Sequence, residues 1–115
     1  MNIDEQTSKR IQELQILEQN LQNLMMQKQT FQIELNEVAN ALSDLKKSDE
    51  EVYKIVGGLM MRSNKSSLIS DLEEKNKILE LRMSSIEKQE KILDERAEKF
   101  KKELSDSILK INKQK

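Results

Sequence analysis

EVYKIVGGLMMRSNKS, residues 51–66, is the stretch of this 115-residue chain that decides its fold. It contains both glycines of the chain and its only tyrosine. Two short runs of β-branched, aromatic and other apolar residues flank the glycine pair, a pattern typical of a β-hairpin. We therefore predict a hairpin over about residues 51–65. The alternative, a disordered or helical turn, fits less well, because a helix–helix connection needs only about 2–8 residues.

The predicted hairpin has no other strand in the chain to pair with. Tyr53 and Ile55 alternate onto one face of its first strand, and Leu59 and Met61 onto one face of the return strand. A lone two-stranded hairpin is marginally stable in water and leaves two edges open. We therefore expect the missing strands to come from other chains, so that the hairpin assembles subunits. The residues expected to build this assembly element are Val52, Tyr53, Ile55, Val56, Gly57, Gly58, Leu59 and Met61.

A long helix is predicted before the hairpin, over about residues 3–47. Its seam alternates steps of three and four residues, which is the heptad pattern of a coiled coil. The seam residues are Leu14, Leu17, Leu21, Leu24, Lys28, Phe31, Leu35, Val38, Leu42 and Leu45. Asn2 and Glu5 have capping-box spacing. Thr7 and Arg10 fall on seam positions, so we expect the first two turns to be weak.

A second long helix is predicted after the hairpin, over about residues 67–113, with Ser66 as its N-cap. Its seam also alternates steps of three and four. The seam residues are Ile69, Leu72, Asn76, Leu79, Met83, Ile86, Glu90, Leu93, Ala97, Phe100, Leu104, Ser107 and Ile111. Seams of matching length predict two helices packed antiparallel as a coiled coil. That packing would bring Lys28 level with Glu90, where the two charges either form an ion pair that sets the register or reach solvent independently.

The composition excludes several classes of function. The 20 basic and 21 acidic residues are mixed along the chain, without the basic stripe of a nucleic-acid-binding protein. Histidine and cysteine are absent, and the carboxylates lie along solvated helices, so we expect no catalytic site, cofactor or metal. No apolar run approaches the roughly 20 residues of a membrane span. The sequence therefore predicts a soluble, cytoplasmic binding protein.

Three stretches resemble the beta subunits of the prefoldin family, the ATP-independent holding chaperones of archaea and eukaryotes. They are MQKQTFQIELNEVANALSDL (26–45), EVYKIVGGLMMRSNKSSL (51–68) and LEEKNKILELRMSSIEKQEKIL (72–93). The similarity covers about residues 10–111, and the single hairpin matches the beta rather than the alpha type. It implies one subunit-sized domain over residues 1–115. Methionines at 60 and 61 depart from the branched aliphatic residues usual in the family.

The resemblance also implies an assembly and an activity. Two alpha-type and four beta-type subunits would join their hairpins into an intersubunit β-barrel from which six coiled coils project. Non-native proteins would be held at the tips of the coils and passed to a group II chaperonin. The competing interpretation is a structural coiled-coil scaffold or tether for one defined partner, which does not need a hairpin.

A holding chaperone needs exposed apolar side chains, and the predicted helices carry several outside their seams. Isolated exposed apolar residues are usually without function. They are more informative where the two chain ends meet and the seam is weakest, because a loose apolar surface adapts to varied unfolded chains. The residues expected to bind clients there are Ile3, Ile11, Ile108, Leu109 and Ile111.

Overall fold

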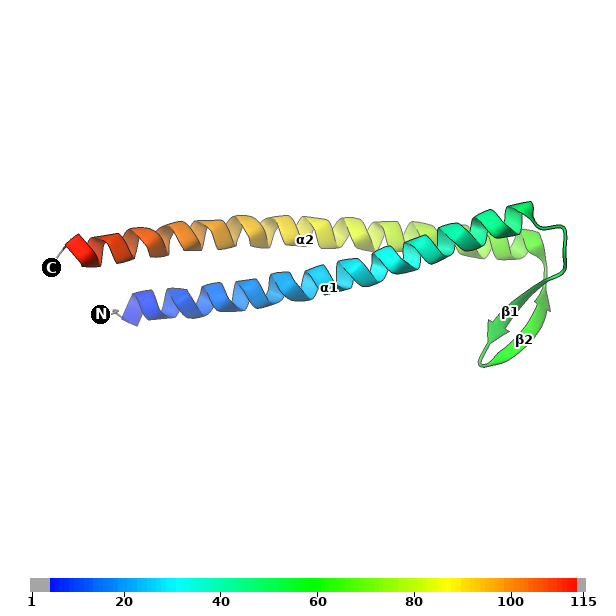
Figure 1. Ribbon diagram of the computed structural model, residues 1–115, viewed down its shortest axis with the longest axis horizontal. Helices are drawn as coiled ribbons and strands as arrows, with labels where there is room; N and C mark the ends of the chain where they lie inside the picture. Colours follow the sequence, from blue (N-terminus) through cyan, green and yellow to red (C-terminus); the bar gives the residue numbers. More distant parts are fainter. Residues whose placement is uncertain (1–4, 114–115) are drawn as a thin grey trace. The chain divides into compact units, whose positions relative to one another are not determined.

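The computed structural model describes residues 5–113, and of residues 111–113 only the backbone (Figure 1). Its elements follow the order α1 (Glu5–Lys47), β1 (Val52–Val56), β2 (Leu59–Ser63) and α2 (Lys65–Lys113). The fold class predicted from the sequence, two long helices joined by a central β-hairpin, is confirmed. The capping role predicted for Asn2 lies outside the described residues.

The length of both helices follows from the sequence. The chain has no proline, so no residue removes a helical hydrogen bond. Side chains spaced by four residues support the solvent-facing side of α1, where Gln19 donates to Asn23 at 3.3 Å and Gln32 to Asn36 at 3.2 Å. Burial of the seam supplies the larger stabilisation, because an isolated helix is marginal in water.

The chain forms two compact units. The terminal unit takes its described residues from 5–28 and 85–113, and the central unit comprises residues 29–84. Each predicted seam residue whose side chain is described is buried or half-buried, in both units. The heptad pattern therefore identified the buried face of each helix correctly.

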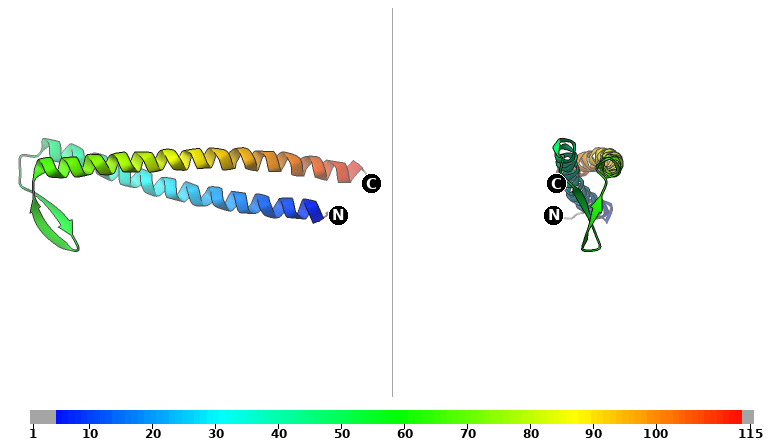
Figure 2. Two further views of the ribbon diagram at one scale, coloured as in Figure 1. Left: turned by 180° about the vertical axis from the view of Figure 1, so that it is seen from behind. Right: turned by 90° about the vertical axis from the view of Figure 1, so that its right-hand side faces the viewer.

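The terminal unit packs the first part of α1 beside the last part of α2, antiparallel (Figures 1 and 2). Its buried apolar residues are Leu17, Leu24, Ile86 and Ala97. Two polar seam positions at the start of α1 also make contacts. Thr7 is only 2% exposed, and Arg10 Nη1 donates to Ser107 Oγ at 3.0 Å. The two polar seam side chains of the turns expected to be weak therefore make contacts, and the weakness of these turns stays a prediction.

Lys28 and Glu90 form an ion pair within the terminal unit. Lys28 Nζ lies 3.4 Å from Glu90 Oε1, and the two side chains are 38% and 25% exposed. The hypothesis that the two charged seam residues pair is thus confirmed. Each is the one charged residue in its main seam, so the contact favours the register in which they meet.

The central unit contains the rest of both helices and the hairpin. Val38 from α1 and Leu79 and Met83 from α2 are its buried apolar residues. The guanidinium of Arg82 lies over the ring of Phe31, 6.0 Å from the centroid, within the range of a cation–π contact.

Polar contacts fix the places where the chain leaves α1 and enters α2. Lys65 Nζ donates to the carbonyl oxygen of Ser48 at 2.7 Å, just beyond the end of α1. Asn64 Oδ1 accepts hydrogen bonds from the backbone N–H groups of Ser66 at 2.9 Å and Ser67 at 3.3 Å. Asn64 is therefore the N-cap, and the prediction that Ser66 plays this part is wrong. Ser66 lies within the first turn of α2, and its own hydroxyl donates to Asn64 Oδ1 at 2.9 Å.

Candidate functional site

The hairpin turns at its two glycines. Gly57 has φ 56° and Gly58 has φ 83°, the positive values that a two-residue type I′ turn requires at both positions. A Cβ atom at either position would meet nothing within 4 Å, so backbone conformation rather than space favours glycine here. This turn matches the right-handed twist of the strands and closes the hairpin at the pair Val56 and Leu59.

The register divides the hairpin side chains between two faces. Residues directly opposite each other share a face, as do residues two apart along a strand. The pairs Tyr53–Arg62 and Ile55–Met60 form one face, which we call the Tyr53 face. The opposite face, which we call the Lys54 face, consists of Val52, Lys54, Val56, Leu59, Met61 and Ser63.

The register shows how the two strand faces predicted from alternation combine. Tyr53 lies opposite Arg62, and Ile55 lies opposite Met60. Leu59 and Met61 lie on the other face of the hairpin. Met60 was absent from the predicted assembly residues although it is 70% exposed. The two-residue turn was the signal that would have identified Met60, because it fixes which residues oppose one another.

Large apolar side chains are exposed on both faces of the hairpin. Ile55 is 73% exposed, Met60 70% and Leu59 68%. Covering one such side chain fully contributes roughly 1.5–3 kcal/mol. The hairpin therefore gains considerable stability if another surface covers it.

The strand edges are also open. A two-residue turn makes its flanking residues, Val56 and Leu59, a hydrogen-bonded pair, and such pairs alternate along an antiparallel ladder. The N–H and C=O groups of Tyr53 and Ile55 then point away from β2, and those of Met60 and Arg62 away from β1. The sheet described for this chain has two strands, so each edge is available to a further strand.

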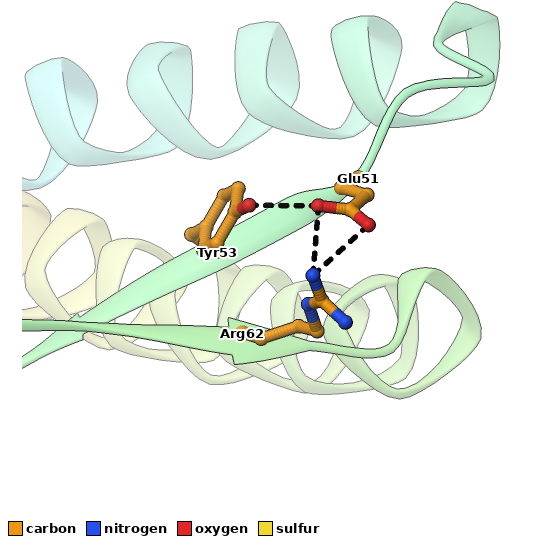
Figure 3. Close-up of polar contacts among 3 residues, drawn as sticks. All are labelled: Glu51, Tyr53 and Arg62. Carbon is orange, nitrogen blue, oxygen red and sulfur yellow. Dashed lines mark hydrogen bonds and ion pairs between the residues drawn. The ribbon is translucent and has the colours of Figure 1, made fainter.

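A polar cluster closes the open end of the hairpin (Figure 3). The hydroxyl of Tyr53 donates to Glu51 Oε2 at 2.8 Å, and Arg62 Nη2 lies 3.1 Å from both carboxylate oxygens of Glu51. Glu51 precedes β1, and Arg62 lies in β2, so the carboxylate links the two strands at their base. No pattern in the sequence indicated this cluster.

The predicted client-binding residues are only partly described. Ile11 and Ile108 are half-buried, and Leu109 is 56% exposed. Ile3 lies outside the described residues, and Ile111 lies in α2 without a described side chain. The structure therefore places Ile11, Ile108 and Leu109 in one unit and makes Leu109 the most accessible of the three.

Two apolar hollows lie on the terminal unit. One, of about 310 Å³, is lined by Lys101, Leu104, Ser105, Ile108 and Leu109. The other, of about 400 Å³, lies between α1 and α2 and is lined by Glu13, Ile16, Leu17, Asn20, Leu93, Arg96 and Phe100. The sequence placed Leu93 and Phe100 in the seam, where they are half-buried, but did not predict that they also border a groove.

No cluster of three or more metal-ligating side chains is found between residues 5 and 113. Neither α1 nor α2, as far as the structure describes them, has a segment long and apolar enough to cross a membrane. The hairpin and the terminal-unit hollows are the candidate binding surfaces, because both present apolar side chains.

Comparisons with known proteins agree with this geometry. The family model described as "Prefoldin subunit" matches residues 8–110. The prefoldin subunit beta of Methanospirillum hungatei is 37% identical, with 93% of this chain and 91% of the relative covered. That of Thermococcus onnurineus is 33% identical, with 93% and 94% covered. The crystal structure of the prefoldin beta subunit from Thermococcus strain KS-1 has a TM-score of 0.85 at 33% identity, covering 92% of this chain and 95% of that one. The chain therefore belongs to the prefoldin family, as a subunit of the beta type.

Proposed function

We propose that this chain is a subunit of an ATP-independent holding chaperone that binds non-native proteins and passes them to a group II chaperonin. Prefoldins are a chaperone family rather than an enzyme family, which supports the general class. The single observation that carries the proposal is the hairpin, whose faces expose apolar side chains and whose two edges are open. A cytoplasmic location forms part of the proposal.

The assembly we propose contains two alpha-type and four beta-type subunits, joined through hairpins that form an intersubunit β-barrel. The open edges at Tyr53 and Ile55 and at Met60 and Arg62 support it, because each can accept a strand from a neighbour. Barrel closure would leave no edge exposed. A tether that binds one defined partner through its helices has no use for these edges.

The client-binding surface we propose lies on the terminal unit. Leu109 and Ile108 line an apolar hollow there, and Ile16 lines the groove between the helices. Apolar surface of this kind, presented without a deep pocket, suits weak binding of many unfolded sequences. Ile3 and Ile111 remain part of the proposal as apolar residues near the two chain ends.

Assembly is tested by native mass spectrometry of the chain alone and mixed with an alpha-type subunit. We expect a hexamer of two alpha-type and four beta-type chains in the mixture. A mixture that contained only separate chains would contradict the proposed assembly.

Client binding is tested by the suppression of aggregation of several unrelated, thermally unfolded proteins. We expect the pair of substitutions Ile108→Ser and Leu109→Ser to weaken suppression strongly while the hexamer still forms. Leu81→Ser is the matched control, because Leu81 lies on the same helix in the central unit and is 71% exposed. Equal loss in the control would argue for a general effect of exposed apolar residues. Suppression of only one protein would favour the tether.

Transfer is tested with a fluorescently labelled client held by the hexamer and mixed with a group II chaperonin. We expect the label to move to the chaperonin without added ATP. Retention of the label on the hexamer would contradict the last step of the proposal.

A further inference from the structure

We propose that the Tyr53 face of the hairpin is the surface that a second copy of this chain covers on assembly, with Glu51 as the counter-charge that allows its burial. This inference rests on the proposed function, because it specifies how hairpins meet in the assembly. It assigns a direction to the hairpin: the Tyr53 face turns toward the neighbour and the Lys54 face turns away from it.

The chain itself covers the Lys54 face somewhat more than the Tyr53 face. At the base of the Lys54 face, Val52 and Ser63 are half-buried. On the Tyr53 face the cross-strand pair Ile55 and Met60 is 73% and 70% exposed. On the Lys54 face Leu59, beside the turn, is 68% exposed, and Val56 and Met61 are 48% and 49% exposed. The adjoining apolar pair with least cover from its own chain is therefore the one that most needs cover from another chain.

The charged group and the hydroxyl group of the Tyr53 face each have a partner within the chain. Its two polar side chains, Tyr53 and Arg62, both contact the carboxylate of Glu51, at 2.8 and 3.1 Å (Figure 3). A buried charge is costly unless it is paired and hydrogen-bonded, and a buried tyrosine hydroxyl needs a partner. Glu51 supplies both partners from within the chain. The Tyr53 face can thus lose water without leaving an unpaired charge.

The balance of charge on the Tyr53 face favours a second copy as the occupant. Glu51 and Arg62 neutralise each other, so two identical Tyr53 faces can approach without repulsion. The Lys54 face carries an exposed ammonium group for which residues 5–113 provide no ion pair or hydrogen bond. Two copies that met through their Lys54 faces would bring like charges together, which disfavours association.

Adjacent methionines give a matched test of the direction. Met60 belongs to the Tyr53 face and Met61 to the Lys54 face, and both lie in β2. The chain has no cysteine, so Met60→Cys and Met61→Cys each introduce a single thiol. The rate of maleimide labelling is measured for each variant as the separate chain and in the assembly. We expect assembly to slow labelling at position 60 at least about tenfold and at position 61 less than about threefold, since a tenfold change corresponds to about 1.4 kcal/mol of protection.

A charge cycle tests the part played by Glu51. We expect Glu51→Gln to raise the concentration needed for assembly at least about tenfold, because Arg62 would then be buried without its counter-charge. The double variant Glu51→Gln with Arg62→Met should assemble within about threefold of the unsubstituted chain, since neither charge is then left unpaired. Lys54→Gln is the control and should change assembly less than about threefold. This cycle decides the matter if cysteine at position 60 prevents assembly.

The outcomes separate this inference from the proposed function. If the unsubstituted chain assembles but position 61 is the better protected, or Glu51→Gln assembles normally, the inference is wrong and the proposed function stands. If the unsubstituted chain assembles neither alone nor with an alpha-type subunit, both are wrong.

Discussion

Exchange of the charges of Lys28 and Glu90 offers a quantitative test of how the two helices hold their register. The atoms Nζ and Oε1 lie 3.4 Å apart. Two unit charges at this distance attract by about 1 kcal/mol in a dielectric of 80 and about 5 kcal/mol in a dielectric of 20. Side-chain exposures of 38% and 25% place the pair between a surface pair and a buried one. After desolvation and side-chain ordering, we expect a net coupling of about 1 kcal/mol.

The test compares Lys28→Glu, Glu90→Lys and the double exchange. Each single change places like charges side by side and should lower the free energy of unfolding by about 1–2 kcal/mol. The double exchange should recover most of this loss, because opposite charges again face each other. Urea unfolding followed by the helical circular dichroism signal gives each value, at a fixed chain concentration and a measured oligomeric state. In 1 M salt, where the Debye length is about 3 Å, the recovered energy should shrink.

The control for this exchange is the pair Glu18 and Lys101, whose atoms are 4.0 Å apart and whose side chains are 54% and 50% exposed. Its coupling should be less than half as large, because both groups are better solvated. If the double exchange at 28 and 90 lowered the free energy of unfolding by the sum of the two single changes, the ion pair would not set the register. Each side chain would then reach solvent independently.

Three further changes test the seam, the helix cap and the turn. Ile86→Ala should lower the free energy of unfolding, measured in urea, by about 2–4 kcal/mol because Ile86 is only 5% exposed. Ile92→Ala, on the same helix but 57% exposed, should lower it far less. An equal loss at both sites would contradict the seam assignment. Asn64→Ala should lower the free energy of unfolding by about 1 kcal/mol in the same measurement, since two backbone N–H groups lose their acceptor. Asn64→Ser should retain most of this stabilisation, because serine is also a good N-cap. Gly58→Val should disorder the hairpin, because a β-branched residue is strained at φ 83°, and the NMR hydrogen exchange of the hairpin amides should accelerate with unchanged helical signal.

The sequence predicted the helices well because their signal is repeated many times. A heptad seam accumulates evidence over each turn, and the structure buries or half-buries its described members. The polar positions were harder to assess. Thr7 and Arg10 break the apolar pattern, yet the first is buried and the second donates to Ser107. Periodicity identifies the face a residue occupies, but not whether a polar side chain finds a partner there.

The cross-strand neighbours in the hairpin could not be predicted from the alternation of residues alone. Alternation assigns faces within one strand, but cross-strand neighbours depend on the turn that joins the strands. With Gly57 and Gly58 as the two turn residues, Met60 falls opposite Ile55, which the alternation alone did not reveal. The contact between Glu51 and Arg62 depends further on side-chain conformation across the ladder. Similarly, Asn64 and Ser66 are both good capping residues, and only the backbone decides which lies at the helix start.

The hydrogen bond from Lys65 to the carbonyl of Ser48 has a consequence for how such a chain can be rebuilt. One lysine side chain spans the gap between the end of α1 and the start of α2. A loop of about 2–8 residues is enough to join two helices, so the length of the segment between them is not needed for the connection alone. Replacing the residues between Ser48 and Lys65 with such a loop would remove the proposed assembly surface while keeping both residues of this hydrogen bond.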